Sequence, residues 1–279
     1  MMNRMLIGTV AVILLLPGLL YLGGTIFTKK QISKEVKNLR TSTRDISANI
    51  YDEDLLVGLP LPVQRYFRYV LSEGQPYVSA VYMEHDGQFK TALDKEWIDI
   101  KGKQYFSADE PGFLWVGKTS LFSVRDMYIS QKGRIKVKLL NIFKLVDGEG
   151  YKYDQGELLR WLGESVWFPT NLLPGPRLRW SAIDNETANL TFKHEGQEVS
   201  YEVSFDALGS IKQLQTRRYM GDAGLETWIG RVSDYQRVNG MLIPMRIEAI
   251  WKIAGEEHSY ARFNIRNIYH NYLIEGANQ

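Results

Sequence analysis

Hydrophobic and polar residues alternate along most of the chain from Tyr77 onward. The clearest examples are the segments 135–139, 188–193, 198–205 and 243–251, where an apolar residue stands at every second position. Alternation with a period of two is typical of β-strands that bury one face and leave the other in water. This region is therefore predicted to form a sheet with one apolar face.

Residue pairs ending in glycine divide this region into strands. They are Asp86-Gly87, Lys101-Gly102, Lys132-Gly133, Glu195-Gly196, Leu208-Gly209, Asn239-Gly240 and Ala254-Gly255. Glycine readily adopts the positive φ angles of two-residue hairpin turns, so each pair predicts a reversal of the chain. The series indicates an antiparallel meander of about eleven strands at ordinary strand lengths.

Two segments repeat their apolar residues at helical spacing instead. The first follows Pro62 and has Val63, Phe67, Val70 and Leu71 on one side. The second runs from Gln155 to about Phe168, with Leu158, Leu159, Leu162 and Val166 on one side and Glu157, Arg160 and Glu164 on the other. Both segments are predicted to be amphipathic helices, and Pro169 ends the second.

Together these elements predict a mainly β fold. An open twisted sheet of more than about ten strands normally curls, splits or flattens. We expect a curled antiparallel sheet, or half-open β-barrel, of about eleven strands, with the two helices covering its apolar concave face. Such a sheet encloses either a packed core or a hydrophobic cavity, and a two-sheet sandwich is the competing architecture.

The amino-terminal region adds a membrane anchor to this picture. The run from Met5 to Phe27 carries no charge, and at about 1.5 Å per residue a helix of this length spans a bilayer core of about 30 Å. No small-residue cleavage site follows the run, which favours an uncleaved anchor over a signal peptide. The chain then divides into an anchor over residues 1–28, a stalk over 29–50 and one β-rich domain over 51–279.

The charges around the anchor leave its orientation open. Only Arg4 precedes the apolar run, whereas the stalk that follows is basic and has Ile32, Val36 and Leu39 at helical spacing. The positive-inside rule then places the domain in the cytoplasm. A short basic leader before an apolar run is instead typical of a secretory signal-anchor, which places the domain outside the cytoplasm, in the bacterial cell envelope. We adopt the second orientation as the expectation, although the charge count opposes it.

Composition and motifs argue against several classes of function. The chain of 279 residues has a formal net charge of +2, which gives no reason to expect a nucleic-acid partner. It has no cysteine, and its four histidines lack metal-binding spacing. No glycine-rich phosphate loop is present, and Ser165 lacks the glycine that follows the nucleophile of a strand-to-helix elbow. We expect neither a metal nor an organic cofactor, and the sequence does not fix the oligomeric state.

The polar side of the second helix is the main candidate site. Glu157, Arg160 and Glu164 stand at i, i+3 and i+7, so the arginine can bridge both carboxylates in a structural ladder. Alternatively, the two carboxylates act as the acid and base of a hydrolase, although their backbones lie about 10 Å apart along the helix axis. Trp161 and Trp167 lie beside this face, and we expect at least one of them at the mouth of a cavity.

Arginines in or beside the strands offer a second kind of site. They are Arg125, Arg217, Arg218, Arg231 and Arg246. Opposite charges across a sheet commonly pair at its surface, which is one interpretation of the neighbours Arg125 and Asp126. An arginine at the rim of a cavity would instead hold a phosphate or carboxylate headgroup while the apolar strand face takes the acyl chain. Both interpretations remain open, because the sequence does not assign these side chains to a face.

Several motifs resemble an uncharacterised bacterial family, a domain of unknown function. The most specific is the stretch from Asp154 to Thr170, DQGELLRWLGESVWFPT. Other similar positions are Leu59–Tyr66, Arg217–Tyr219, Trp228, Asp234-Tyr235, Gly240, Ile243-Pro244 and Trp251. The order of helix, strands, short helix and strands also resembles the lipoprotein carriers LolA and LolB. The first resemblance implies a domain without a known activity, and the second implies a fold that binds amphiphiles.

We therefore expect a membrane-anchored protein that binds a lipid or other amphiphile in a half-barrel cavity. The candidate ligand-binding residues are Glu157, Arg160, Trp161, Glu164, Trp167, Trp228, Tyr235 and Trp251. One alternative is a membrane-bound hydrolase that uses Glu157 and Glu164. Another is a non-catalytic interaction module of the cell envelope, which requires a solid interior beside an exposed aromatic patch.

Overall fold

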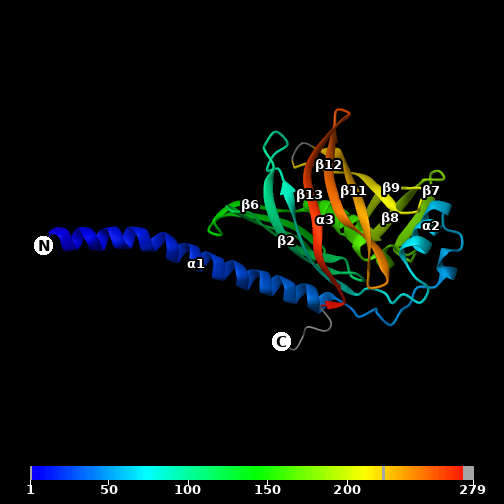
Figure 1. The fold of residues 1–279 in the computed structure, drawn as a ribbon, viewed down its shortest axis with the longest axis horizontal. Helices are drawn as coiled ribbons and strands as arrows, with labels where there is room; N and C mark the ends of the chain where they lie inside the picture. The colour runs from blue at the N-terminus through cyan, green and yellow to red at the C-terminus, as the bar shows by residue number, and fades with distance from the viewer. Residues whose placement is uncertain (1, 222–223, 273–279) are drawn as a thin grey trace.

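The computed structural model describes residues 2–221 and 224–272, with side chains from residue 18 onward. Figure 1 shows a long amino-terminal helix, α1 (Met2–Ser42), that extends from one side of a β-rich domain. The short helices that follow are η1 (Glu53–Leu56), α2 (Leu61–Val70), α3 (Tyr151–Glu164), η2 (Ser165–Trp167) and η3 (Pro169–Leu172). Both helices predicted for the domain are confirmed as α2 and α3.

The domain is built on one antiparallel sheet of thirteen strands. The first six are β1 (Ala80–Phe89), β2 (Ile98–Ser107), β3 (Gly112–Lys118), β4 (Phe122–Ile129), β5 (Lys132–Leu139) and β6 (Phe143–Glu149). The others are β7 (Leu178–Ala182), β8 (Thr187–His194), β9 (Gln197–Phe205), β10 (Ile211–Tyr219), β11 (Leu225–Val238), β12 (Met241–Ile253) and β13 (Glu256–His270).

The sheet consists of two meanders joined in the middle. Strand order is β6-β5-β4-β3-β2-β1-β13-β12-β11-β10-β9-β8-β7, so β1 pairs with β13 and the two edges are β6 and β7. The chain runs outward from β1 to β6, crosses by α3 to the far edge at β7, and returns strand by strand. The predicted mainly β, antiparallel class is confirmed. The sheet is open and single, so the alternative of a two-sheet sandwich is wrong.

The predicted number of strands was too low because glycine pairs are an incomplete guide to turns. Two hairpins reverse on non-glycine residues with positive φ, at Ser130-Gln131 and at Leu140-Asn141. Conversely, Gly102 lies inside β2, where an added Cβ would fall 2.0 Å from Nε2 of His85. Gly102 therefore makes room for the imidazole ring of His85, and the turn predicted at this position is wrong. Asp86-Gly87 likewise lies inside β1.

The helices cover different faces of the sheet. Helix α3 contacts β3, β4, β5, β6, β9 and β10, and therefore lies inside the curl. Helix α2 contacts β8 and β12, and α1 contacts β2, β3 and β4 from the outer side. The stalk residues predicted to be helical do lie in α1, where Leu39 is fully buried against Leu114, Val116 and Met127. The carboxyl-terminal part of α1 is thus packed against the domain.

The anchor predicted over residues 5–27 begins in the part of α1 whose side chains lie outside the described residues. In the part of the chain that the structure does describe, no helix is both long enough and apolar enough to cross a bilayer.

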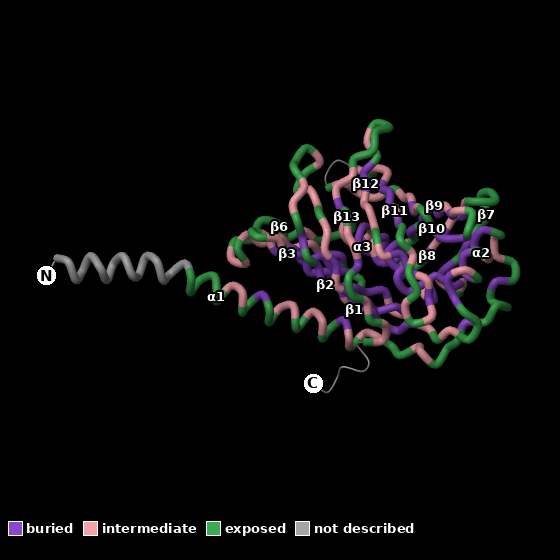
Figure 2. The backbone as a smooth tube through the Cα atoms, viewed as in Figure 1, coloured by how far each residue is buried: buried purple, intermediate pink, exposed green. Residues whose placement is uncertain are grey.

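Buried residues concentrate inside the curl (Figure 2). One half of this interior, between α2, α3 and strands β7–β10, is filled by large side chains. Among them are Tyr66, Phe67, Trp161, Trp167, Phe168, Trp180 and Phe205, all of which belong to one continuous cluster. The other half, bounded by β3–β6 and β10–β13, is less completely filled and contains the site described next.

Candidate functional site

A cavity of about 650 Å³ lies between the concave face of the sheet and α3. Its walls are mostly apolar and come from both meanders. They include Trp115, Val124, Val137, Trp228, Ile247 and Phe263. The polar side chains near α3 are Asp126, Arg160, Glu164 and Arg218, and the other polar lining residues are Lys90, Thr91 and Tyr260. The volume and the mainly apolar lining with a few polar groups are those of a small-molecule binding site, whose usual range is about 300 to 1,000 Å³.

Small residues in adjacent strands create part of this space. Gly230 on β11 pairs with Ala249 on β12, and Ala249 pairs with Ala261 on β13. All three line the cavity. Since neighbouring strands lie about 4.8 Å apart, Ala249 and Ala261 leave a shallow region of the sheet that larger residues would fill. At Gly230 an added Cβ would fall 2.9 Å from Cη2 of Trp228, so this glycine makes room for the indole at the cavity wall.

Arg160 is the centre of a buried polar cluster at the floor of the cavity. Its Nε donates to Oε1 of Glu164 at 2.9 Å, and its Nη1 donates to Oδ2 of Asp126 at 2.5 Å. The guanidinium also lies over the rings of Phe113 and Trp115, at 5.1 and 5.0 Å from their centroids. Two charge-assisted hydrogen bonds and two aromatic faces thus satisfy this cation within the protein.

Arg218 is less completely satisfied than Arg160. Its Nη2 lies 3.9 Å from Oε1 of Glu157, and its guanidinium lies 5.8 Å from the ring centroids of both Trp228 and Trp251. Its Nε is buried and has no hydrogen-bond partner among the described residues. Because a buried donor without a partner costs free energy, this nitrogen marks a position where a ligand acceptor would be favourable.

Burial raises the pKa of two glutamates in the cluster. Burial, and next the negative charge of Asp126, raise the pKa of Glu157 well above its ordinary value, and a hydrogen bond with Asp126 acts in the same direction. Oε2 of Glu157 and Oδ1 of Asp126 are buried and have no other hydrogen-bond partner among the described residues. A proton on Glu157 would satisfy both oxygens, which adds to the effect of burial on this pKa. Burial also raises the pKa of Glu164, although Arg160 opposes it.

A second layer of polar contacts positions the floor of the cavity. Nε2 of Gln104 donates to Oε2 of Glu164 at 2.6 Å. Nε1 of Trp115 donates to Nε2 of His85 at 2.7 Å. Burial, followed by the positive charge of Arg160, lowers the pKa of His85 to about 4, so this imidazole is neutral near pH 7 and accepts the indole proton.

The structure brings together some of the predicted site residues. Arg160, Glu164 and Trp228 line the cavity, and Glu157 and Trp251 contact Arg218 just behind its wall. The ladder expected along α3 forms on one side only, because Arg160 bonds Glu164 and Asp126 while Glu157 faces Arg218.

Trp161, Trp167 and Tyr235 lie elsewhere. The two indoles are almost fully buried, and their Nε1 groups donate to the backbone oxygens of Ser107 and Pro244 at 2.8 and 3.0 Å. The expectation that one of them stands at a cavity mouth is therefore wrong, because both rings are buried in the packed core and neither lines the cavity. The hydroxyl of Tyr235 donates to the backbone oxygen of Ile211 at 2.8 Å, away from the cavity.

Asp126 and Arg218 belong to the site, but the sequence alone does not assign either of them to the cavity. Surface pairing of Asp126 with Arg125 is one interpretation that the sequence leaves open, yet consecutive residues of a strand point to opposite faces. Asp126 faces Arg160 inside the curl, whereas Arg125 faces Glu35 of α1 outside it. Their position in the alternating segment of β4 was the available signal. Arg218 was one of several arginines, and only the register of β10 and β11 assigns its face.

No group of three or more histidine, aspartate or glutamate side chains is arranged to hold a metal ion among the residues that the structure describes. The charged cluster instead pairs carboxyl groups with guanidinium groups.

Comparison with known proteins gives a family and two distant structures. A model for a family of unknown function, DUF6544, matches residues 49–263. No curated protein matches the sequence. A LolA superfamily protein from Nitrosomonas europaea has 11% identity and a TM-score of 0.41, with 74% of this chain and 90% of that chain covered. A domain described as a candidate outer membrane lipoprotein-sorting protein from Vibrio parahaemolyticus has 8% identity and a TM-score of 0.38, with 70% and 86% covered.

Proposed function

Because the chain belongs to this family of unknown function, we propose a function from its site: the domain binds an anionic amphiphile, with the apolar chain in the cavity and the headgroup at Arg218. The observation that carries the proposal is an incompletely paired guanidinium at the floor of a mainly apolar cavity. An acyl chain with a carboxylate or phosphate headgroup combines the two chemistries that this arrangement offers.

The apolar part of the ligand would be held by burial alone. The lining side chains come from strands on both sides of the curl, so a chain in the cavity would be enclosed by Val124 and Val137 on one side and by Ile247 and Phe263 on the other. Each methylene group that leaves water for such a site contributes about 0.8 kcal/mol. No particular chain length is required for this contribution.

Arg218 is a better headgroup ligand than Arg160. Arg160 already bonds two carboxylates, and a further anion would have to compete with both. Arg218 has one distant carboxyl neighbour, Glu157, and the raised pKa of that group reduces the negative charge beside the guanidinium. The flanking rings of Trp228 and Trp251 hold the guanidinium plane in position. An anion that accepts hydrogen bonds from both Nε and Nη2 would therefore form two charge-assisted contacts and displace only the distant contact with Glu157.

The alternatives are less well supported by the geometry. A hydrolase using Glu157 and Glu164 would need both carboxyl groups at the same cleft, but only Glu164 lines the cavity, and both of its oxygens accept hydrogen bonds. An interaction module was expected to have a solid interior beside an exposed aromatic patch. Exposed tyrosines do occur at Tyr269 and Tyr272, but the interior is not solid.

Binding of a fluorescent fatty acid tests this proposal, with the full-length chain held in nanodiscs of zwitterionic lipid. The test variant is Arg218→Gln, and its matched control is Arg217→Gln, because Arg217 is the exposed neighbour on the opposite face of β10. Loss of a charge-assisted contact of about 1.5 to 3 kcal/mol predicts affinity weakened by at least about tenfold in the test variant. The control should bind like the wild type.

Two results would contradict the proposal. One is the absence of saturable binding by the wild-type chain. The other is equal affinity of Arg218→Gln and Arg217→Gln, which would remove the headgroup role. Circular dichroism and the unfolding midpoint of each variant establish that the comparison is made on folded protein.

A further inference from the structure

We propose that the tip of the hairpin formed by β5 and β6, together with the adjoining face of α1, docks on the surface of a lipid bilayer, so that the edge of the cavity opens toward the membrane. The docking surface does not depend on the proposed ligand. Only its consequence for ligand uptake rests on the proposed function, and the two are tested separately below.

The hairpin exposes an unusual number of apolar side chains. Leu140 and Phe143 stand at its tip, with exposed fractions of 40% and 59%. Leu145 and Val146 follow on β6, where they are 52% and 41% exposed and also line the cavity. The edge strand is therefore both an apolar surface and the rim of the cavity. Exposed apolar clusters of this kind are uncommon on a surface that faces only water.

The apolar part of α1 lies directly against this tip. Nδ2 of Asn141 donates to Oγ1 of Thr25 at 3.4 Å, and a Cβ added to Gly24 would stand 2.8 Å from the backbone oxygen of Asn141. Along the same stretch of α1, the large exposed side chains are Leu19, Leu20, Tyr21, Leu22, Ile26 and Phe27. The hairpin and the helix thus present one joined apolar surface.

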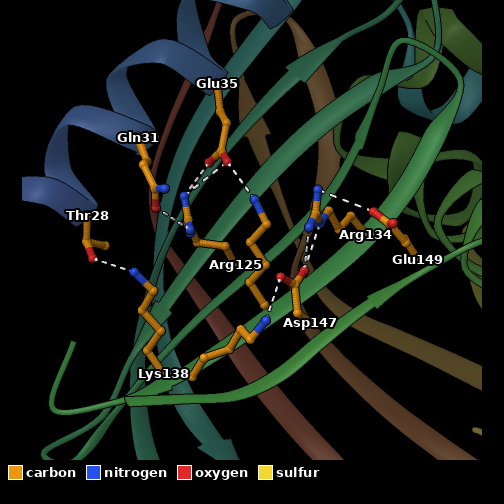
Figure 3. Close-up of polar contacts among 10 residues, drawn as sticks. Thr28, Gln31, Glu35, Arg125, Arg134, Lys138, Asp147 and Glu149 are labelled. Carbon is orange, nitrogen blue, oxygen red and sulfur yellow. Dashed lines mark hydrogen bonds and ion pairs between the residues drawn. The ribbon is translucent and has the colours of Figure 1, made fainter. Parts of the chain in front are cut away.

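A buried ion pair fixes this arrangement. Figure 3 shows Glu35 of α1 accepting hydrogen bonds from Arg125 on β4, whose Nη1 lies 3.0 and 2.9 Å from the two carboxylate oxygens. Nζ of Lys136 on β5 lies 3.4 Å from Oε1 of the same carboxylate. Nη2 of Arg125 also donates to Gln31 at 2.8 Å. The side chain of Arg125 is only 4% exposed, so separating the helix from the sheet would leave a buried charge unpaired. The ion pair therefore holds the apolar tip of the β5–β6 hairpin beside the apolar part of α1.

Lysines border the apolar surface on the side of the domain. Nζ of Lys138 bonds Oγ1 of Thr28 and lies over the ring of Phe27. Lys29 and Lys30 are exposed on the next turn of α1, and Lys144 is exposed on β6. Long cationic side chains beside apolar ones are typical of segments that meet anionic headgroups while the apolar residues enter the membrane interface. This combination favours a bilayer over an apolar protein partner.

The absence of cysteine allows a direct measurement of depth. A single environment-sensitive fluorophore is attached to Phe143→Cys in the full-length chain, in nanodiscs that contain phosphatidylglycerol and phosphatidylcholine. The control is Leu208→Cys, which is 69% exposed in the wild type and lies between β9 and β10 near the opposite edge of the sheet. The probe at position 143 should be quenched by spin-labelled lipid, and the control probe by aqueous iodide. Equal quenching by iodide at both positions would overturn the proposal. The apolar surface would then have to meet something other than the bilayer, such as a protein partner.

A second experiment measures the consequence for uptake. Phe143→Asp leaves the lining of the cavity unchanged, since Phe143 does not contribute to it. It should slow transfer of the fluorescent fatty acid from donor vesicles by about tenfold, while the affinity for the same probe added from solution stays that of the wild type. Leu208→Asp is the control. A wild-type transfer rate in Phe143→Asp would contradict entry at this edge, whereas failure of probe binding in every variant would contradict only the proposed function.

Discussion

The two halves of the interior are built by the same alternation of apolar and polar residues, yet only one of them is filled. Between α2, α3 and β7–β10, aromatic rings interlock, as in the pairs Trp161 with Phe192 at 5.1 Å and Tyr66 with Phe205 at 5.8 Å. Between β3–β6 and β10–β13, glycine and alanine stand at adjacent inward positions and leave the cavity. The alternation therefore determines which face is inside, whereas side-chain size across neighbouring strands determines whether that inside is solid.

The largest expected loss of stability follows from replacing a tryptophan, and it should differ between the two halves. Trp167→Ala removes a fully enclosed ring and should lower the free energy of unfolding by about 3 to 5 kcal/mol. Trp228→Ala enlarges an existing cavity, so its cost should be smaller by about 1 to 2 kcal/mol. Denaturant titrations of both variants measure the difference. Equal costs would contradict the distinction between a filled and a hollow half.

In the hollow half, His85 should give the fold a pH-dependent stability. Burial lowers the pKa of His85 from 6.5 to about 4. A base whose pKa is lowered by folding stabilises the fold fully when the pH is above its ordinary pKa of 6.5, and this contribution is lost as the pH falls toward 4. At about 1.4 kcal/mol per pH unit, the free energy of unfolding should decrease by roughly 3 kcal/mol over this window.

Two variants identify the origin of that slope. His85→Gln should have a shallower pH dependence between pH 6.5 and 4 than the wild type, because only other groups with a lowered pKa, such as His194 and His270, still contribute. His258→Gln, at an exposed position, should retain the wild-type slope. If the slope were the same in both variants, another group would be responsible, and the neutral, buried state of His85 would not be supported.

A matched pair of alanines gives the smallest but most selective comparison. Ala188→Leu adds methylene groups to the filled half, where Ala188 is completely buried, and should cost about 1 to 3 kcal/mol. Ala249→Leu adds the same groups beside the cavity and should change stability by less than about 0.5 kcal/mol. Only the second variant should lose binding of the fluorescent fatty acid. A large loss of stability in Ala249→Leu would show that this region has no spare volume.

Much of the fold follows from local patterns in the sequence. The alternation in segments such as 188–193 predicts the strands, and the spacing of Leu158, Leu159 and Leu162 predicts α3. The strand number was less predictable, because some turns place a residue that seldom adopts positive φ, such as Leu140, in that conformation.

The site was only partly predictable, because its parts meet through long-range register. Arg160 and Glu164 are identified from one helix, but their partner Asp126 lies on β4, and the sequence leaves open which face of the sheet it occupies. The small residues of the cavity come from three different strands. Gly230, Ala249 and Ala261 become neighbours only when β11, β12 and β13 pair in their observed register. A single sequence does not specify that register.

Photochemical crosslinking tests most directly where the ligand lies. A fatty acid carrying a diazirine on its chain is bound to the full-length protein in nanodiscs, irradiated, and located by peptide mass spectrometry. The account predicts adducts in residues 122–137 and 225–249, which border the cavity, and their loss when unlabelled fatty acid competes. Adducts confined to α1, or adducts that competition does not reduce, would contradict a ligand held inside the curl.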